Sequence, residues 1–527
     1  MRFRLAVTVA IATAALVSAG CSSSPSAPKS AAVTSSIQSF TIGTTFPENN
    51  IDPTKGYGST ISSLSLEKLT EISPSGAIEP YLASSVTHPS LLTYVYQLRH
   101  GIRFWDGSPL TAADAAYSLN YERAAASQES SLFTSVKSIT ASGPYTVTIT
   151  LSHPDPSLAY AVASSGFIFE KKFAREHAGK FGNPGVLIMG TGPWEVRSLD
   201  PTTGAQLTAN PHWWRGKVPI QNISFKFFAN DTSAALAFRA GEIDMDPFID
   251  GPKSFAASSG ARIWAAPTDC TNALFSMNTS VAPWNDVHVR RAIAYALNRQ
   301  DIIQAEGGYA QPYSTFIPVK MLQHIATGAQ ISALLKSLPL YPYSPARARQ
   351  ELAQSRYPHG FTAPVTVFIY GNVVSTAEAI AGELQKIGIN MQVKPVTLAA
   401  WGTDLSGPPA KRPASYFTTG CNTPDASGYD WLIGQANLAP GQYNAAVWDP
   451  PESDKLISQG LTASTSAGRF AAYSRLLRLI ATDVPYIPLF LHDYSIALSS
   501  KYRFAGYNQF SINDSLPYAL SIRPASP

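Results

Sequence analysis

Residues 262–303 read RIWAAPTDCTNALFSMNTSVAPWNDVHVRRAIAYALNRQDII, and this segment indicates the class of fold. It begins as an extended strand-like segment and turns at residues 283–286, Pro-Trp-Asn-Asp. Asp286 is placed to cap a helix, and the apolar residues that follow it recur at helical spacing, at Val289, Ile293, Ala296 and Leu297. A strand, a turn and a helix in this order are typical of an α/β protein.

Residues 364–396, farther along the chain, repeat the alternation of strand and helix. Strands are predicted at Pro364–Tyr370 and Ile389–Val396, with a helix over Thr376–Ile387 that Gly388 is placed to end. Such a unit predicts parallel strands joined by a right-handed crossover. Because ligands bind beyond the carboxyl ends of strands in sheets of this kind, the turn at residues 371–372 is a candidate ligand contact.

The remaining periodic segments predict a mixture of strands and helices on both sides of residues 262–303. Alternating residues predict strands at 38–44, 92–98, 102–105, 145–151, 205–209 and 222–228. Helical periodicity predicts helices at 59–70, from Thr111 with Asp114 completing a capping box, at 232–240 and at 467–482.

The composition describes a globular protein with more than one domain. The chain has 527 residues, of which 45% are apolar and 14% are charged, so it is long enough for two or three separate cores. The formal net charge is +4. Because no basic cluster alternates with aromatic residues, nucleic acid is not an expected partner.

The N-terminus carries an export signal. Arg2 and Arg4 precede an apolar run too short to span a bilayer, which predicts a signal peptide over residues 1–20. Small residues before Cys21 resemble a bacterial lipobox, in which the Cys is lipidated; the alternative is a cleaved, freely secreted chain. Residues 21–36, rich in Ser, Ala and Pro, predict a flexible tether. The expected location is the outer face of the cytoplasmic membrane.

Two cysteines remain after Cys21, namely Cys270 and Cys421. An even pair in an exported protein favours a disulfide bridge. Two buried thiols are the alternative, since free cysteines are often buried.

Several separated motifs carry a resemblance to a known family. They are the segment from Asn278 to Arg299, residues 93–122 (TYVYQLRHGIRFWDGSPLTAADAAYSLNYE), residues 190–194 (GTGPW), residues 241–244 (GEID) and residues 484–489 (VPYIPL). In this order, they resemble the extracytoplasmic solute-binding proteins of ABC importers, most closely family 5, which includes peptide- and nickel-binding members. The resemblance extends over residues 38–527.

The resemblance implies an α/β, two-lobed periplasmic-binding-protein-like fold of class II, or cluster C, with an inserted small α+β domain. Its predicted parts are lobe 1 (37–72, 188–268 and 491–527), the inserted domain (73–187) and lobe 2 (269–490). The chain is expected to cross between the lobes near Cys270 and near Leu491. Family members also have cysteines at the places of Cys270 and Cys421, which favours the bridge.

The function implied by the resemblance is capture of a short peptide or another small solute between the lobes, followed by delivery to an ABC permease. We expect a monomer with no enzymatic activity, cofactor or metal. The same fold binding a metal chelate, haem or saccharide is an alternative. An exported hydrolase is a more remote one, because the sequence has neither a Gly-x-Ser-x-Gly nor a His-Glu-x-x-His motif, and a chaperone or adhesin on the same fold is a third.

Candidate ligand contacts lie in the loop after the first strand, which faces ligand in the family, and in the segment before and after Cys421. They are Phe46, Glu48, Trp401, Phe417, Thr419, Asn422, Thr423 and Asp425. A surface turn remains the alternative for the first two, and ordinary core aromatics for Trp401 and Phe417.

One position departs from the family pattern. In peptide-binding members an Asp two residues after the cleft Cys pairs with the α-ammonium group of the peptide, and here Thr423 stands at that place. Either Asp425 takes over this role from two residues later, or the anchor is absent. In the second case the ligand is an N-blocked peptide or is not a peptide.

Overall fold

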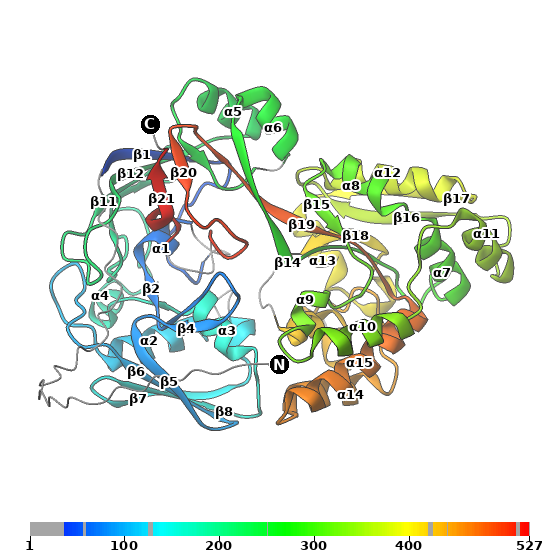
Figure 1. Cartoon of the computed structure of the whole chain (residues 1–527), viewed down its shortest axis with the longest axis horizontal. Helices are drawn as coiled ribbons and strands as arrows, with labels where there is room; N and C mark the ends of the chain where they lie inside the picture. Colours follow the sequence, from blue (N-terminus) through cyan, green and yellow to red (C-terminus); the bar gives the residue numbers. More distant parts are fainter. Residues whose placement is uncertain are drawn as a thin grey trace, which may run out of the picture. The chain divides into compact units, whose positions relative to one another are not determined.

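One mixed sheet contains eleven of the strands in the described part of the chain (Figure 1). The computed structural model describes residues 36–55, 60–124, 130–249, 251–419, 425–439, 441–512 and 517–525. From Ser36 onward the chain forms one compact unit. The strand order is β10-β11-β12-β1-β13-β19-β14-β18-β16-β17, with β15 paired to β19. The predicted signal peptide and nearly all of the tether lie outside the described residues.

Lobe 1 is built around one half of this sheet, in which β1 (Ile37–Thr44) lies parallel to β12 (Ile220–Phe227) and β13 (Met245–Asp246). Antiparallel strands extend its outer edge, and short helices and the C-terminal segment cover it. These elements are β10 (Trp194–Asp200), β11 (Gly204–Ala209), α1 (Thr60–Ser65), α5 (Asp231–Arg239), α6 (Pro252–Ser259), β20 (Tyr502–Phe504) and β21 (Ile522–Pro524).

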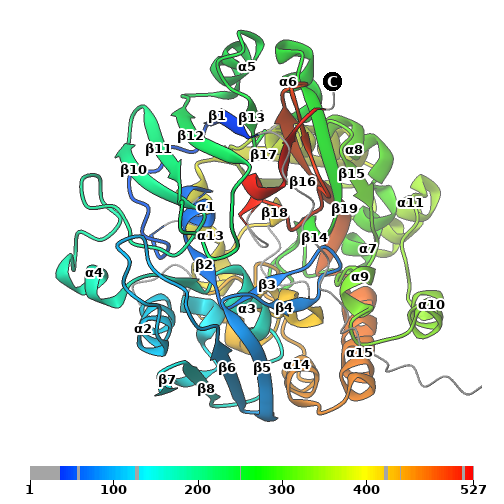
Figure 2. The same ribbon diagram turned by 60° about the vertical axis from the view of Figure 1, so that its left-hand side comes forward.

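A small α+β region follows α1 in the chain and contains its own sheet, in the order β5-β6-β8-β7. Figure 2 shows this sheet well apart from β1 and β12. The elements are β2 (Glu67–Lys68), β3 (Thr70–Ile72), β4 (Ile78–Pro80), β5 (Ala83–Ser90), β6 (Thr93–Leu98), α2 (Ala112–Glu122), β7 (Val136–Gly143), β8 (Thr146–Leu151), α3 (Leu158–Ser164), β9 (Phe167–Ile168) and α4 (Lys171–Glu176).

Lobe 2 contains the other half of the large sheet, with β16 (Phe361–Phe368) parallel to β17 (Ile389–Val396) and to β18 (Ser415–Thr419). Helices pack around this half. They are α7 (Val287–Ala296), α8 (Arg299–Glu306), α9 (Val319–Leu322), α10 (Gly328–Ser337), α11 (Pro345–Gln354), α12 (Val373–Gln385), α13 (Leu398–Leu405), α14 (Ser453–Thr462) and α15 (Ser466–Asp483), with the short strand β15 (Ala310–Pro312) and the 3-10 helix η3 (Ala426–Leu432).

Two long antiparallel strands run through both lobes, β14 (Arg262–Ser276) and β19 (Tyr486–Leu498) (Figure 1). Their pairing is interrupted between Pro267 and Asn272. The hydrophobic cores divide at the same place. One cluster of buried residues runs from Cys270 to Phe490, and a second combines residues from Ile37 to Met245 with residues from Ile496 to Ile522. The chain therefore passes between two cores along these strands, near the predicted crossings.

The fold class is confirmed, and so are many predicted elements. β17 has the predicted bounds, the parallel pairing of β16 with β17 is present, and the Asp286 side chain accepts a bond from the His288 backbone N–H at 2.9 Å to cap α7. Thr111 and Asp114 form the predicted capping box of α2. The numbered boundaries between the lobes stay predictions.

Two predicted elements were wrong. The helix expected over residues 59–70 ends at Ser65, because the residues after it pair as strands. This pairing directs the carboxylate of Glu67 into the interior, where buried side chains donate hydrogen bonds to it. The strand expected at residues 102–105 is reduced to a single bridge between Arg103 and Pro109. There the chain closes a tight turn through Gly107, whose φ of +88° suits glycine.

Candidate ligand-binding site at the facing strand ends

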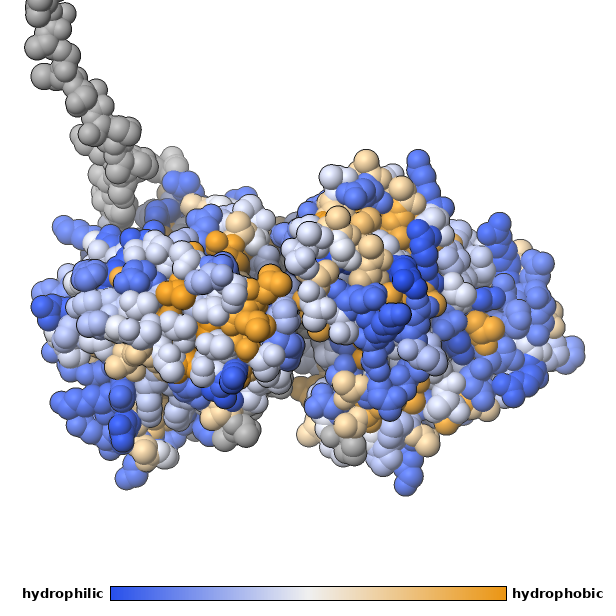
Figure 3. All heavy atoms as spheres, turned by 90° about the horizontal axis from the view of Figure 1, so that it is seen from below, coloured by the Kyte–Doolittle hydropathy of each residue, from blue (hydrophilic) through white to orange (hydrophobic). Residues whose placement is uncertain are grey.

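The carboxyl ends of the parallel strands in each lobe carry apolar side chains. In lobe 1, Phe46 follows β1 and Phe248 follows β13. In lobe 2, Tyr370 follows β16 and Leu398 follows β17. Because strands that run parallel end at the same edge of a sheet, each lobe gathers these residues at one edge. A groove separates the two lobes on the face seen in Figure 3.

Six aromatic side chains form a continuous series of ring contacts that passes from lobe 1 to lobe 2, and we name it the aromatic row. The distances between successive ring centroids are 5.6, 6.1, 6.2, 5.0 and 5.5 Å for the series Phe248, Phe46, Tyr370, Phe368, Trp401 and Phe417. These spacings lie within the range of favourable aromatic pairs. The crossing between the lobes is the contact of Phe46 with Tyr370.

The aromatic row is exposed at its middle and buried at its lobe 2 end. Phe46 is 43% exposed and Tyr370 is 40% exposed, whereas Phe368 and Phe417 are buried. Trp401 is half-buried, and its indole N–H donates to the Ser415 hydroxyl at 2.9 Å, which fixes the ring. The row therefore presents fixed aromatic faces to solvent at the point where the lobes meet.

The structure brings three of the predicted site residues into this row, namely Phe46, Trp401 and Phe417. Two other predicted residues have contacts of a different kind. Glu48 accepts bonds from the backbone N–H groups of Thr60 and Ile61 at 3.0 and 3.4 Å, at the start of α1. Thr419 ends β18, and its hydroxyl donates to the side-chain oxygen of Asn272 on β14 at 2.8 Å.

Asp425 lies in a buried ion pair with Arg469 of α15. The guanidinium donates to both carboxylate oxygens, at 2.6 and 3.0 Å, and the Ser427 backbone N–H and hydroxyl donate at 2.9 and 2.6 Å. Burial alone would raise the pKa of Asp425, but the bonds from Arg469 and its charge, with those from Ser427, hold this pKa below its usual value. These contacts favour a structural role over the ammonium-binding role considered above.

Asp430, five residues later, has a pKa shifted in the opposite direction from that of Asp425. Burial raises the pKa of Asp430 well above its usual value, and the charge of Asp425 adds to this shift. A hydrogen bond from the Tyr473 hydroxyl at 3.0 Å opposes it. The fold therefore favours the protonated form of the Asp430 carboxyl.

The charges of Asp425 and Arg469 influence the pKa values of two tyrosines in the inserted region of lobe 1. Burial raises the pKa values of Tyr94 and Tyr160 to about 12. The charge of Asp425 adds to both shifts, after that of Asp155 for Tyr94, and the charge of Arg469 opposes them. The ring of Tyr160 also lies 6.4 Å from the ring of His324, which follows α9 in lobe 2. The ion pair therefore lies on the side of lobe 2 that faces the inserted region.

The other predicted residues, Cys21, Cys421, Asn422 and Thr423, lie outside the described residues. Cys270 is buried in β14, and its carbonyl accepts a bond from the Tyr429 hydroxyl. The predictions about lipidation, the bridge and the ligand contacts of residues 422 and 423 therefore stay predictions.

Sequence reasoning missed several members of the apolar edge, namely Phe248, Ile369, Tyr370 and Leu398. A usable signal existed, since each follows the end of a strand and the strand-end rule had selected residues 371–372. Asn372 itself immediately precedes α12, and its side-chain amide donates to the Glu306 carbonyl at 2.7 Å.

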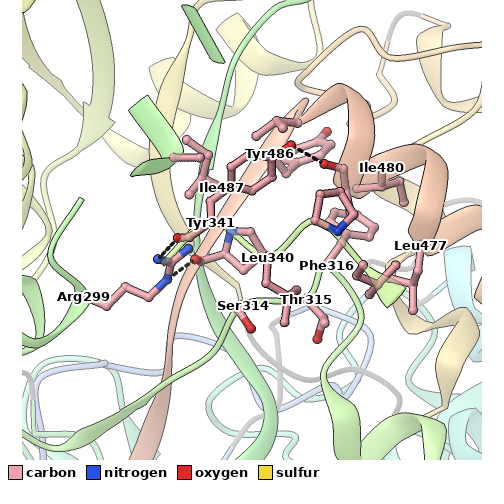
Figure 4. A pocket seen from close by; sticks show the side chains of 16 residues that line it. Arg299, Ser314, Thr315, Phe316, Leu340, Tyr341, Leu477, Ile480, Tyr486 and Ile487 are labelled. Atoms are coloured by element: carbon pink, nitrogen blue, oxygen red, sulfur yellow. Dashed lines mark hydrogen bonds between the residues drawn. The ribbon is translucent and has the colours of Figure 1, made fainter. Parts of the chain in front are cut away.

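A separate small pocket in lobe 2 is lined mainly by residues of α15, of β19 and of the loops at residues 314–316 and 338–341 (Figure 4). Its volume is about 30 Å³, which is room for one or two water molecules. Arg299 borders it and donates to the carbonyls of Tyr313 and Pro488 at 3.1 and 2.9 Å. The cavity is too small for a peptide or a sugar and is not a candidate ligand site.

Two cores joined by two crossing strands, with strand ends that face one another, define a two-lobed solute-binding fold. The chain belongs to the bacterial extracellular solute-binding proteins, family 5, whose model matches residues 77–453. In the part of the chain that the structure describes, no helix has both the length and the apolar composition needed to cross a membrane.

Curated relatives agree with this family. A putative ABC transporter peptide-binding protein of Brucella ovis is 25% identical over 431 residues, which are 79% of each chain. The glutathione-binding protein GsiB of Escherichia coli K12 is 26% identical over 415 residues, 76% of this chain and 77% of its own.

Solved structures share the fold. The substrate-binding protein CtaP of Listeria monocytogenes superimposes with a TM-score of 0.78 at 21% identity, over 93% of this chain and 99% of its own. DppA of Helicobacter pylori, solved with the peptide STSA, gives 0.73 at 20% identity over 92% and 98%. MoaA of A. tumefacien R10, solved with mannopinic acid, gives 0.73 at 23% identity over 93% and 100%.

Proposed function

We propose that this protein is the substrate-binding component of an ABC importer, and that it captures short peptides between its lobes and delivers them to a membrane permease. The family and the peptide- and glutathione-binding names of its relatives support a peptide-like ligand. The observation that carries the proposal is the aromatic row, because it places apolar faces of both lobes beside one another at the strand ends.

The proposed mechanism is hinge closure. The interruption between Pro267 and Asn272 in the pairing of β14 with β19 gives the crossing strands a place to bend. A ligand that contacts Phe46 in one lobe and Tyr370 in the other binds the closed form more tightly than the open form. That difference in affinity is what drives closure.

Asp269 lies within this interruption and contacts both sides of it. Its carboxylate is 2.6 Å from the ammonium of Lys320 in lobe 2 and accepts a bond from the side-chain amide of Gln509 in the C-terminal segment of lobe 1. The backbone N–H of Asp269 donates back to the Gln509 side chain. We propose that these contacts guide the bending of the hinge.

The deciding experiment is mass spectrometry of small molecules released by denaturation from soluble protein that comprises residues 22–527. Short peptides of shared length, confirmed by titration calorimetry with synthetic copies, are the expected result. A single non-peptide compound would contradict the peptide proposal and leave the solute-binding class intact.

A second candidate is a solute that is not a peptide with a free N-terminus. It is favoured by the pairing of Asp425 with Arg469, which occupies the carboxylate that an α-ammonium group would need. The same fold is seen with mannopinic acid in MoaA. A metal chelate, haem or a saccharide belongs to this candidate, and the released-ligand spectrum distinguishes it from the first.

We further propose that Cys21 carries the lipid anchor and that Cys270 and Cys421 form a disulfide bridge. The antiparallel register pairs Asn272 with Thr419. The sequence has one cysteine two residues before Asn272 and another two residues after Thr419. Paired residues in such a ladder are close enough for a bridge. Thiol alkylation of residues 22–527 with and without reductant, read by intact mass, tests the bridge, and lipid labelling of full-length chain and Cys21→Ala tests the anchor.

We also propose that the protein is a monomer without catalytic activity, as expected for a binding protein that hands on its ligand unchanged. Recovery of intact peptide after prolonged incubation with the purified protein is the expected outcome. Release of shorter products would revive the hydrolase alternative.

A further inference from the structure

Exposed apolar side chains concentrate at the facing strand ends. Among the described residues, nine large hydrophobic side chains are exposed, and four of them follow β1, β16 or β17: Phe46 (43%), Ile369 (61%), Tyr370 (40%) and Leu398 (58%). The other five lie elsewhere, in ones and twos. A gathering of exposed apolar surface on a soluble protein marks a binding site more often than chance does.

Backbone hydrogen bonds order the chain beside this surface. The Phe46 backbone N–H donates to the Thr44 hydroxyl at 3.1 Å, and that of Ile369 donates to the Val396 carbonyl at 2.9 Å. A backbone that is already ordered loses less entropy on binding, so contacts to it convert more efficiently into affinity.

Two carboxylates near this surface already have partners, and so does Asp425 on the side of lobe 2 that faces the inserted region. Asp425 is paired with Arg469, Glu48 caps the start of α1, and Glu306 accepts a bond from the Thr376 hydroxyl at 2.6 Å. From residue 415 to residue 425 the sequence contains one acidic residue, Asp425. The surface thus offers apolar contact without a spare charge from this segment.

We propose that Phe46, Tyr370, Ile369 and Leu398 form a selectivity surface for apolar and aromatic side chains, and that the ligand is held without an ion pair between its N-terminus and Asp425. This inference rests on the proposed peptide-binding function and narrows it to peptides with apolar side chains, whether or not the N-terminus is blocked.

The test is titration calorimetry of residues 22–527 with four tripeptides, Ala-Phe-Ala, Ala-Ala-Ala, Ala-Asp-Ala and Ala-Lys-Ala, each with a free and an acetylated N-terminus. We expect Ala-Phe-Ala to bind about tenfold more tightly than the other three, because one aromatic side chain gains a buried contact. Acetylation should change the affinity by less than about threefold, since no ion pair is lost.

Matched variants locate the effect. Tyr370→Ala should weaken Ala-Phe-Ala binding about fivefold or more and remove most of its advantage over Ala-Ala-Ala, because the lost contact is with the aromatic side chain. Its control is Tyr343→Ala, since Tyr343 is a tyrosine of the same lobe with 42% exposure, and this variant should bind like the parent. Leu398→Ala and Leu236→Ala form a second pair, with 58% and 56% exposure. Melting temperatures close to that of the parent establish that each variant is folded.

The outcomes separate the inference from the function beneath it. If peptides bind but Ala-Phe-Ala has no advantage, or if Tyr370→Ala behaves like Tyr343→Ala, the selectivity surface is refuted while the peptide function stands. If acetylation abolishes binding, the statement about Asp425 is refuted. If none of the eight peptides binds and the released ligand is not a peptide, the proposed function fails and takes the inference with it.

Discussion

The aromatic row and the Asp425–Arg469 ion pair hold opposite kinds of side chain in opposite environments. The row leaves Phe46 and Tyr370 exposed to solvent, although apolar groups usually stabilise a protein by burial. The ion pair is buried, although charges are usually left in water. Neither the exposed rings nor the buried charges would be favoured by the stability of the fold alone. We infer that the exposed apolar surface is kept for the ligand and that the buried charges are satisfied within lobe 2.

The largest effect should come from breaking the buried pair. Asp425→Ala leaves Arg469 buried without its partner and should cost about 3–5 kcal/mol of unfolding free energy, measured by urea titration. The matched control is Glu452→Ala, because Glu452 pairs with Arg475 of the same helix but at the surface. That change should cost less than about 1 kcal/mol.

A different result for Asp425→Ala would reverse our interpretation of this residue. If stability were unchanged while peptides with a free N-terminus bound much more weakly than their acetylated forms, Asp425 would be the ammonium anchor. Its pairing with Arg469 would then describe the state without ligand.

An exposed ring and a buried ring of the aromatic row should respond differently to the same substitution. Phe368→Ala removes a buried ring and should cost about 3 kcal/mol of unfolding free energy. Phe46→Ala removes an exposed ring and should change stability by less than about 0.5 kcal/mol. Ligand affinity should fall about fivefold for Phe46→Ala. Equal losses of stability would mean that Phe46 is a core residue rather than part of a binding surface.

The two carboxyls beside Arg469 should give opposite dependences of stability on pH. The pKa of Asp425 is lowered by folding, so its contribution is present above the unfolded value of 3.8 and is lost as pH falls into the acid range. The pKa of Asp430 is raised, so its protonated form stabilises the fold at low pH, and this contribution declines as pH rises above 3.8.

Asp430→Asn isolates the second of these effects. The amide keeps an acceptor for the Tyr473 hydroxyl but does not titrate, so the decline in stability above about pH 4 should become shallower. Urea titrations at pH 5 and pH 8 measure this difference directly. An unchanged decline would show that another buried acid, such as Glu71 with its pKa raised to about 7 by burial, dominates this range.

The sequence predicted the parts of the fold that local patterns determine. β17, the capping box at Thr111 and the parallel unit around α12 follow from periodicity and turn residues within a few positions of one another. The helix expected over residues 59–70 failed because Glu67 accepts bonds from Tyr81, Thr191, Trp213 and Trp214, which are up to 147 residues away. Such contacts leave no local pattern.

The site was predicted in part for the same reason. Phe46 and Trp401 came from the family resemblance and Phe417 from its place near Trp401 in the sequence, and the structure places all three in one row. The exposure of Tyr370 depends on where the strands of the two halves of the large sheet end relative to one another, which periodicity does not encode. The pairing of Asp425 with Arg469 joins residues that are 44 positions apart, and the many other acidic and basic residues of the chain offered the same pairing on sequence grounds.

The smallest effect should come from the exposed ion pair at the hinge, between Lys320 and Asp269. Lys320 is 54% exposed, so water screens the pair, and Lys320→Ala should cost less than about 1 kcal/mol, with a smaller difference from the parent at 1 M salt. Asp269 keeps its bonds to Gln509 in this variant, so peptide affinity should change by less than about threefold. Calorimetry at low and high salt measures both quantities. A loss of stability as large as that of Asp425→Ala would show that the hinge pair is as poorly hydrated as the buried one, and the contrast between charges kept for the fold and charges left in water would no longer hold.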